Sequence, residues 1–252
     1  MSLRFPATRI ASLAEFESWL HQMRPELDQR WLYEQQQIKS GLSATRPGTC
    51  GLCLAPAIFH SSLPPENRNW REEMICNCRH HLSNRERALL HFLKANIGAA
   101  ATQRIALVGP EIAIETPLAE AGLHIAHLPR LLNGRLAAKD QSADHVICAD
   151  YLQYVPPLRL LLDELSRLLG AGGNLLLTVP FDVASPYTKS LQIDLPRTAT
   201  DTAHSLHLFG WDLLDILRDV GFSDVAAHFY WSDEFAYLGP FNMIISATRL
   251  PQ

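Results

Sequence analysis

The sequence contains no apolar run that approaches the roughly 18 residues of a membrane-spanning helix. Its first stretch, MSLRFPATRIASLAEF, has no apolar segment long enough for a secretory signal peptide. A basic stripe of the kind that binds nucleic acid is also missing, and the formal net charge is −4. We therefore expect a cytoplasmic protein that binds neither membranes nor nucleic acids, and a zinc-ribbon nucleic-acid binder is the least favoured function.

Glycine is scarce where a nucleotide-binding fold usually has several. The segment RIALVGPEIAIETPL, from Arg104 to Leu118, is typical of a buried strand followed by a turn and a short helical stretch. Its only glycine is Gly109, and Pro110 follows directly. Gly109 can make the turn, but Pro110 removes one backbone N–H group from the segment that follows.

The overall composition is that of an ordinary globular protein. Of the 252 residues, 47% are hydrophobic and 19% are charged. A chain of this length can bury a sizeable core without disulfides or metals. It accommodates one large α/β domain with an attached module.

The first 40 residues have a helical pattern. Ser12 and Glu15 form a capping box, and apolar residues follow at helical spacing. Pro25 is expected to interrupt or restart the helix, after which PELDQRWLYEQQQI continues the pattern. We expect residues 1–40 to form N-terminal helices that pack on the main domain or on a protein partner.

Five cysteines are present, and four of them form the tight pairs Cys50-x2-Cys53 and Cys76-x-Cys78. Four thiolates from two short knuckles can close a tetrahedron around zinc, and such a site is structural because it leaves no open position. The spacing therefore predicts a zinc-binding module with a connecting helix over residues 41–98. Ser83 and Glu86 form the capping box of that helix.

Two alternatives to this metal site stay open. The C-x-C pair is tighter than the usual C-x2-C, so His80 or His81 can replace Cys78 as a ligand. Four buried cysteines without a metal are the other alternative. The fifth cysteine, Cys148, lies in the apolar run DHVICAD and is expected to be a core residue. Arg85 and Arg87 are interpreted as surface charges that form ion pairs.

Beyond residue 103, strand and helix patterns alternate, which favours a parallel sheet covered by helices over residues 99–252. The leucine stripe of PPLRLLLDELSRLLGAGG predicts a helix that stops at Gly170, and GWDLLDILRDVGF predicts another. The stretch from Asp182 to Ser205 is expected to be an irregular lid or binding loop. The predicted strands are RIALV, HIAHL, DHVICA, NLLLTVPF, SDVAAHFYWSD and FNMIISATR.

Several of these motifs occur in a known family. RLLGAGG, Arg167 to Gly173, followed by LLLTVPF resembles the helix, turn and fifth strand of class I S-adenosylmethionine-dependent methyltransferases. A closer resemblance is to bacterial methyltransferase-like proteins with an N-terminal cysteine module, and it covers roughly residues 45–250. The matching module residues are Cys50, Cys53, Trp70, Arg71, Glu72, Cys76, Cys78, Asn84, Arg85, Arg87 and Ala88.

The resemblance implies an α/β fold with a Rossmann-like methyltransferase sheet, mostly parallel with an antiparallel last strand. It also implies N-terminal helices and a small zinc-binding module. S-adenosylmethionine and a structural zinc ion are the expected cofactors. The positions matching the cofactor-binding region are Gly109, Pro110, Glu111, Asp150 and Tyr151.

The chain also departs from the family pattern. Relatives often carry a Glu-His pair after the fourth strand, and the corresponding segment here, ADYLQYV, has neither residue. The second strand and its end, HIAHLPR, offer no carboxylate for the ribose hydroxyls. His204, His207 and Tyr151 are candidate catalytic residues, although solvated loop histidines and a packing tyrosine are the simpler interpretation.

Two functions of different classes follow. The first is an S-adenosylmethionine-dependent methyltransferase acting on a small molecule or sugar-like intermediate. The second is a catalytically silent methyltransferase-like domain that serves as a binding or assembly partner. The altered loop at Gly109 favours the second.

Overall fold

The structure is a computed structural model, and it describes residues 4–39, 45–61, 64, 69–97, 102–110, 113–155, 157–192 and 205–251. Glu111, His204 and Gly98 lie outside the described residues. Among the described residues, none of the helices has both the length and the apolar character that crossing a membrane requires.

A seven-stranded sheet organises the molecule, in the order β1-β11-β12-β8-β7-β5-β6. The four strands β6, β5, β7 and β8 run parallel, and β12 lies antiparallel between β8 and β11. This confirms the predicted mostly parallel methyltransferase-like sheet with an antiparallel last strand. The strands are β1 (Ala7–Ile10), β5 (Arg104–Val108), β6 (His124–Leu128), β7 (Ala143–Ala149), β8 (Leu169–Thr178), β11 (Phe222–Tyr230) and β12 (Met243–Arg249).

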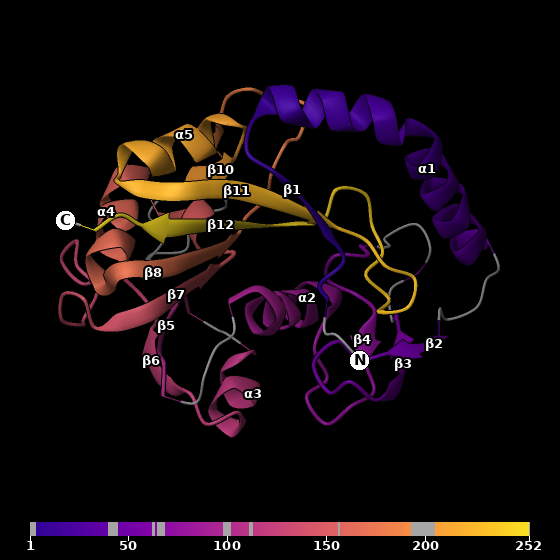
Figure 1. Ribbon diagram of the computed structural model, residues 1–252, viewed down its shortest axis with the longest axis horizontal. Coiled ribbons are helices and arrows are strands. Elements are labelled where there is room, and N and C mark those ends of the chain that lie inside the picture. The colour runs from indigo at the N-terminus through magenta and orange to yellow at the C-terminus, as the bar shows by residue number, and fades with distance from the viewer. Residues whose placement is uncertain are drawn as a thin grey trace.

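Helices cover both faces of the sheet (Figure 1). Helices α4 (Leu158–Leu168) and α5 (Asp212–Asp219) bury their leucines in one core, together with Val146 and Cys148 of β7. Helix α2 (Asn84–Phe92), which continues into a π-helical turn (Leu93–Ile97), and α3 (Glu115–Glu120) border the opposite core, which contains Ile147. Alternate residues of β7 thus face opposite cores, as a central strand requires.

Three details of this domain differ from the predictions. Helix α4 ends at Leu168, and the strand β8 begins at Leu169 instead of after Gly173. The reason is that Leu169 has an extended backbone and pairs with Ala143 of β7. Strand β1 was not predicted, and it pairs antiparallel with β11 at the sheet edge.

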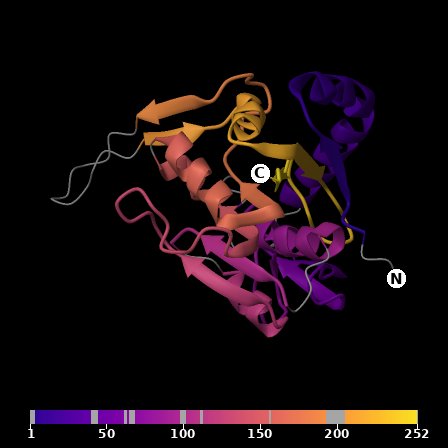
Figure 2. The same cartoon turned by 60° about the vertical axis from the view of Figure 1, so that its left-hand side comes forward.

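The segment predicted as irregular also contains regular structure. Strands β9 (Lys189–Gln192) and β10 (Ser205–Leu208) form an antiparallel pair, so the prediction of an entirely irregular stretch from Asp182 to Ser205 was wrong. Figure 2 shows these strands extending beside the helices of the main domain. β10 also lies against the short turn Leu152–Tyr154 that follows β7.

The N-terminal region forms one helix, α1 (Leu13–Lys39), and not two. Pro25 lies inside this helix, which bends along its length (Figure 1). A proline removes one backbone hydrogen bond but leaves the rest of a long helix able to continue with a bend. The Ser12 hydroxyl accepts a hydrogen bond from the backbone N–H of Glu15 at 3.2 Å, as the capping box predicts.

The cysteine segment is a small antiparallel sheet rather than irregular chain. Its strands are β2 (Thr45–Thr49), β3 (Pro56–His60) and β4 (Ile75–Cys76). A third core, which contains Phe59, Trp70 and Met74, joins this sheet to Ala236 and Leu238 of the β11–β12 connection. The predicted capping box of α2 is confirmed, because Ser83 and Glu86 satisfy each other's backbone N–H groups.

Candidate functional site

The strand order reverses direction between β5 and β7. The chain passes from β5 to β6 on one side, and the next strand, β7, lies on the other side of β5. In open α/β sheets, ligands bind at the carboxyl ends of the strands that flank this switch point. Gly109 follows β5 and Asp150 follows β7, so both lie at the switch point, where such folds have their ligand-binding crevice.

Gly109 occupies a position that needs glycine. Its φ is +135°, and a β-carbon built there would lie 3.2 Å from the β-carbon of Tyr151. Its N–H group donates to the carbonyl of Leu128 at 3.2 Å, and its own carbonyl accepts from Nε2 of His127 at 2.8 Å. The predicted cofactor positions Gly109 and Tyr151 are therefore adjacent, while Pro110 is exposed.

A carboxylate also lies near the end of β6, although β6 itself carries none. Oε2 of Glu115, from α3, is 3.5 Å from Nδ1 of His127. The Glu115 side chain is about half exposed at 46%, so its carboxylate remains accessible to a ligand. The sequence pattern did not indicate this residue, because the acid that holds a ribose is expected at the end of the strand and Glu115 lies on the helix before it.

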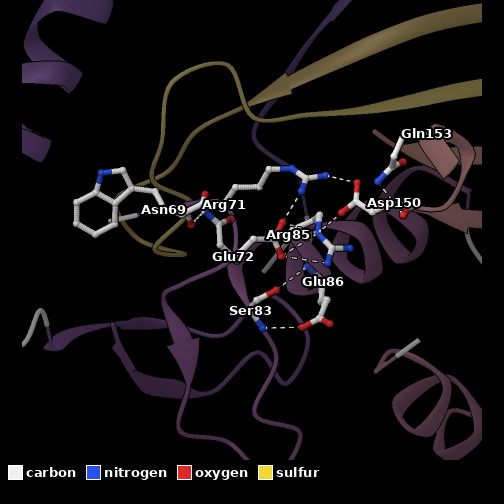
Figure 3. A network of polar contacts seen from close by, with 10 residues as sticks. Asn69, Arg71, Glu72, Ser83, Arg85, Glu86, Asp150 and Gln153 are labelled. Atoms are coloured by element: carbon white, nitrogen blue, oxygen red, sulfur yellow. Dashed lines mark hydrogen bonds and ion pairs between the residues drawn. The ribbon is translucent and has the colours of Figure 1, made fainter. Parts of the chain in front are cut away.

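Asp150 is held by two arginines of the cysteine module (Figure 3). Its Oδ1 lies 2.6 Å from Nη2 of Arg71, and its Oδ2 lies 2.9 Å from Nε of Arg85. Glu72 pairs with both arginines, so two cations and two carboxylates balance. Burial lowers the pKa of Arg85, but the hydrogen bond to Glu72 and the charge of Asp150 outweigh it and raise that pKa.

The remaining candidate residues lie apart from this network. Burial raises the pKa of the half-buried Tyr151 hydroxyl, so this group stays protonated at neutral pH. His207 lies on β10, where its Nδ1 is 3.2 Å from the hydroxyl of Ser190. No described contact joins His207 to Gly109 or Asp150.

The cysteine pairs do converge. The sulfurs of Cys50, Cys53 and Cys78 lie within 4.8 Å of one another. The thiol of Cys76 hydrogen-bonds to Cys50, and its sulfur also accepts from the N–H of Cys78 at 3.3 Å. The hydrogen bond from Cys76 lowers the pKa of Cys50. Three sulfurs thus lie within reach of one metal ion, and Cys76 adjoins them as the fourth thiol that a tetrahedral site would need.

Neither histidine belongs to this sulfur group. Among the described residues, the group that can hold a metal contains Cys78 and not His80 or His81. Nε2 of His80 instead faces Oε2 of Glu120 at 3.6 Å. The fifth cysteine, Cys148, is fully buried in the main core, which confirms its prediction, and burial raises its pKa to about 12.

The surroundings of Arg87 fit a negatively charged metal centre. Its side chain is fully buried, so the prediction of a surface charge was wrong. Its guanidinium donates to the carbonyls of Phe235 at 2.7 Å and Met74 at 2.9 Å, and it lies over the ring of Phe59 at 4.2 Å. No carboxylate among the described residues pairs with it.

A buried cation without a counter-charge is costly. Burial lowers the pKa of Arg87, an effect that Tyr237, Cys50 and Cys76 oppose. Four thiolates around one Zn²⁺ would carry a net negative charge, so a zinc ion held by these cysteines would supply the missing counter-charge. The donor set and its surroundings therefore fit zinc.

A cavity of about 450 Å³ adjoins Arg71 at the carboxyl end of β8. Its walls combine apolar side chains with a few polar ones, as small-molecule sites do. They include Asn69, Arg71, Val179, Pro180, Phe181, Phe241, Asn242 and Met243.

No family model and no curated protein matches the sequence. Among solved structures, the chain is similar to a Burkholderia thailandensis 1,6-didemethyltoxoflavin-N1-methyltransferase with bound S-adenosylhomocysteine, with 14% identity, a TM-score of 0.46 and coverage of 66% of this chain and 78% of that one. It is also similar to the glycopeptide N-methyltransferase MtfA, with 14% identity, a TM-score of 0.47 and coverage of 62% and 87%.

A third similar structure is a complex that contains a methyltransferase activator of Haloferax volcanii and a methyltransferase. The identity is 12%, the TM-score is 0.40, and the match covers 60% of this chain and 83% of that one. The neighbours are thus methyltransferases, and the similarity concerns the fold alone. Since these TM-scores are below 0.5, the fold assignment rests on the strand order described above.

Proposed function

We propose that the protein is an S-adenosylmethionine-dependent methyltransferase that acts on a small molecule or sugar-like intermediate. The observation that supports this proposal is the pairing of Gly109 and Tyr151 across the switch point of the sheet, where a side chain on Gly109 would contact Tyr151 at 3.2 Å. A glycine at this position lets a ligand approach the backbone closely.

The residues around this crevice have separable roles in the proposal. When bound, S-adenosylmethionine supplies a methyl group on a sulfonium ion. Glu115 is the carboxylate that would accept hydrogen bonds from the ribose hydroxyls, and Gly109 would admit the methionine portion. The ring of Tyr151 would pack against the ligand. Methyl transfer then needs mainly an acceptor held in line, which the 450 Å³ cavity beside Arg71 has room to hold.

The proposal assigns the zinc ion a structural role. Cys50, Cys53, Cys76 and Cys78 would hold it, and they leave no position open for water or substrate. Residues 41–98 would then form a zinc-binding module with its connecting helix, between the N-terminal segment 1–40 and the α/β domain 99–252. Its role in the site is indirect, because the module supplies Arg71 and Arg85 to Asp150.

Calorimetric titration of the metal-replete protein with S-adenosylhomocysteine tests the proposal. We expect stoichiometric binding in the micromolar range, abolished by Gly109→Val. Gly170→Ala is the matched control, because a β-carbon at Gly170 meets no atom closer than 3.9 Å. An absence of heat from a protein that melts cooperatively would contradict the proposal.

A second candidate is a catalytically silent domain that acts as a binding or assembly partner. The observation that favours it is that the carboxylate of Asp150 is already engaged by Arg71 and Arg85, at 2.6 and 2.9 Å. In this case the switch-point crevice would serve as the contact between the module and the sheet. The same titration separates the candidates, because a silent domain gives no heat with S-adenosylhomocysteine.

A further inference from the structure

A second cavity, of about 550 Å³, lies beneath α1. It is bordered by the start of β1, the carboxyl end of β11 and the β11–β12 connection, over which α1 arches (Figure 1). The two cavities share Gly239, Pro240 and Phe241, so they are neighbours along the carboxyl edge of the sheet. This cavity contains none of the switch-point residues.

Helix α1 does not close onto the sheet along its length. Of its 27 residues, only Phe16 and Glu34 are buried, one near each end of the helix. The cavity lies between these two contacts and is lined by residues from Trp19 to Glu34. The helix therefore covers the cavity without filling it.

Seven aromatic rings line this space: Phe5, Trp19, Trp31, Phe229, Tyr230, Trp231 and Phe241. Trp19 stacks on Phe229 with 5.6 Å between ring centroids, so these two rings are held in place. Trp31 remains 55% exposed although it lines the cavity. An exposed indole beside an aromatic wall provides a surface on which a flat apolar molecule can stack.

Glu34 places a carboxylate in this aromatic wall. The side chain is only 3% exposed, and its Oε1 accepts hydrogen bonds from Nε1 of Trp231 at 2.8 Å and from the N–H of Gly239 at 2.9 Å. Burial raises its pKa, an effect that these two hydrogen bonds and the charge of Arg30 oppose. A buried carboxylate with a perturbed pKa in an apolar cavity is typical of a ligand site.

The other charges of the cavity are matched. Arg30 pairs with Glu26 and its guanidinium lies 4.9 Å from the ring of Trp231, while Arg24 pairs with Asp28 at 3.4 Å. Arg4, the remaining cation of the lining, is exposed. The buried charge of the lining is therefore the Glu34 carboxylate, which favours a ligand that donates a hydrogen bond.

We propose that this cavity binds a planar, largely apolar small molecule with an ammonium group, which stacks on Trp31 and donates an N–H group to the carboxylate of Glu34. The site is separate from the switch-point crevice, so it does not depend on methyl transfer. The aromatic rings supply apolar contact, and Glu34 selects ligands by their donor.

Three probes with one ring system test this site by isothermal titration calorimetry: tryptamine, indole and indole-3-propionate. We expect tryptamine to bind about tenfold more tightly than indole, and indole-3-propionate to bind more weakly than either. Glu34→Gln keeps an oxygen for Trp231 and Gly239 but removes the charge, so it should abolish the preference for tryptamine. Trp31→Ala should lower the affinity for all three probes.

Tyr187→Ala is the control, because Tyr187 is 71% exposed and lies outside the cavity lining. Its affinities should equal those of the parent protein. The proposal is overturned if tryptamine shows no saturable binding to the folded protein, if indole-3-propionate binds more tightly than tryptamine, or if Glu34→Gln leaves the preference unchanged. Each outcome is independent of the S-adenosylhomocysteine titration, which reports on Gly109.

Discussion

Arg71 and Asp150 form an ion pair across 79 residues of sequence, with 2.6 Å between Nη2 and Oδ1. The arginine belongs to the cysteine module and the carboxylate follows the central strand β7. The pair therefore joins the module directly to the carboxyl edge of the sheet.

Removal of this pair should destabilise the protein moderately. Both side chains are largely buried, at 29% and 20% exposure, so we expect Arg71→Ala to lower the free energy of unfolding by about 1–2 kcal/mol. Urea denaturation measures the change. Arg9→Ala is the control, because its pair with Asp224 is exposed at 48% and 69%, and its effect should be smaller. Equal effects of the two variants would contradict a docking role for Arg71.

The cysteine group should hold one zinc ion per chain. We expect Cys50→Ser to release the metal and to lower the melting temperature, because metal-binding free energy is folding free energy in such modules. Elemental analysis of the purified protein measures the metal. Cys148→Ala is the control, since Cys148 lies in the core beneath α4 and α5. This variant should leave the metal content unchanged. A parent protein without metal, or a Cys50→Ser variant that retains it, would rule out the site.

Arg87 should strengthen metal binding through its charge. We expect Arg87→Met to lower the affinity for zinc by at least about tenfold, because it removes the buried cation beside Cys50 and Cys76. Competition with a chelator measures this affinity. Arg87→Lys keeps the charge and should restore part of this affinity. If methionine and lysine reduced zinc affinity equally, the guanidinium would act by packing against Phe59 alone.

Protonation of His228 should reduce stability in mild acid. Burial lowers its pKa from 6.5 to about 4, and Arg9 adds to the effect. Because the folded-state pKa lies below the unfolded one, the stabilisation is complete above pH 6.5 and is lost as the pH falls to about 4. The free energy of unfolding should therefore fall by about 3 kcal/mol over this window.

His228→Gln removes this titration and tests its origin. Urea denaturation at the two ends of the window should show a smaller loss of stability for the variant than for the parent protein. Nε2 of His228 lies 2.8 Å from the hydroxyl of Ser246, a contact that glutamine can also make. Parallel losses in both proteins would assign the acid sensitivity to other groups.

Strong periodic patterns were sufficient to predict the main sheet and its helices. The leucines of α4 recur at helical spacing and are buried together, so that pattern corresponds directly to packing. β1 escaped prediction because its four residues, ATRI, are half polar and contact a single neighbouring strand. Short edge strands depend on tertiary pairing, which local sequence does not encode.

The candidate site was predicted only in part. Gly109, Asp150 and Tyr151 follow strands, so their meeting at one sheet edge follows from topology. The arginines on Asp150 come from a module far away in sequence, and Glu115 reaches the end of β6 from a helix. The burial of Arg87 could not be predicted, because arginines are mostly exposed unless a buried partner is known.

The pairing of β1 with β11 has a consequence for truncated forms of the protein. Strand β1 covers β11 from Ala227 to Tyr230, a stretch that includes the buried residues Phe229 and Tyr230. A fragment that begins at β2 would leave these backbone groups unpaired on an apolar edge. Such an edge is a template for strand addition by another chain, so the fragment would be prone to aggregate through β11.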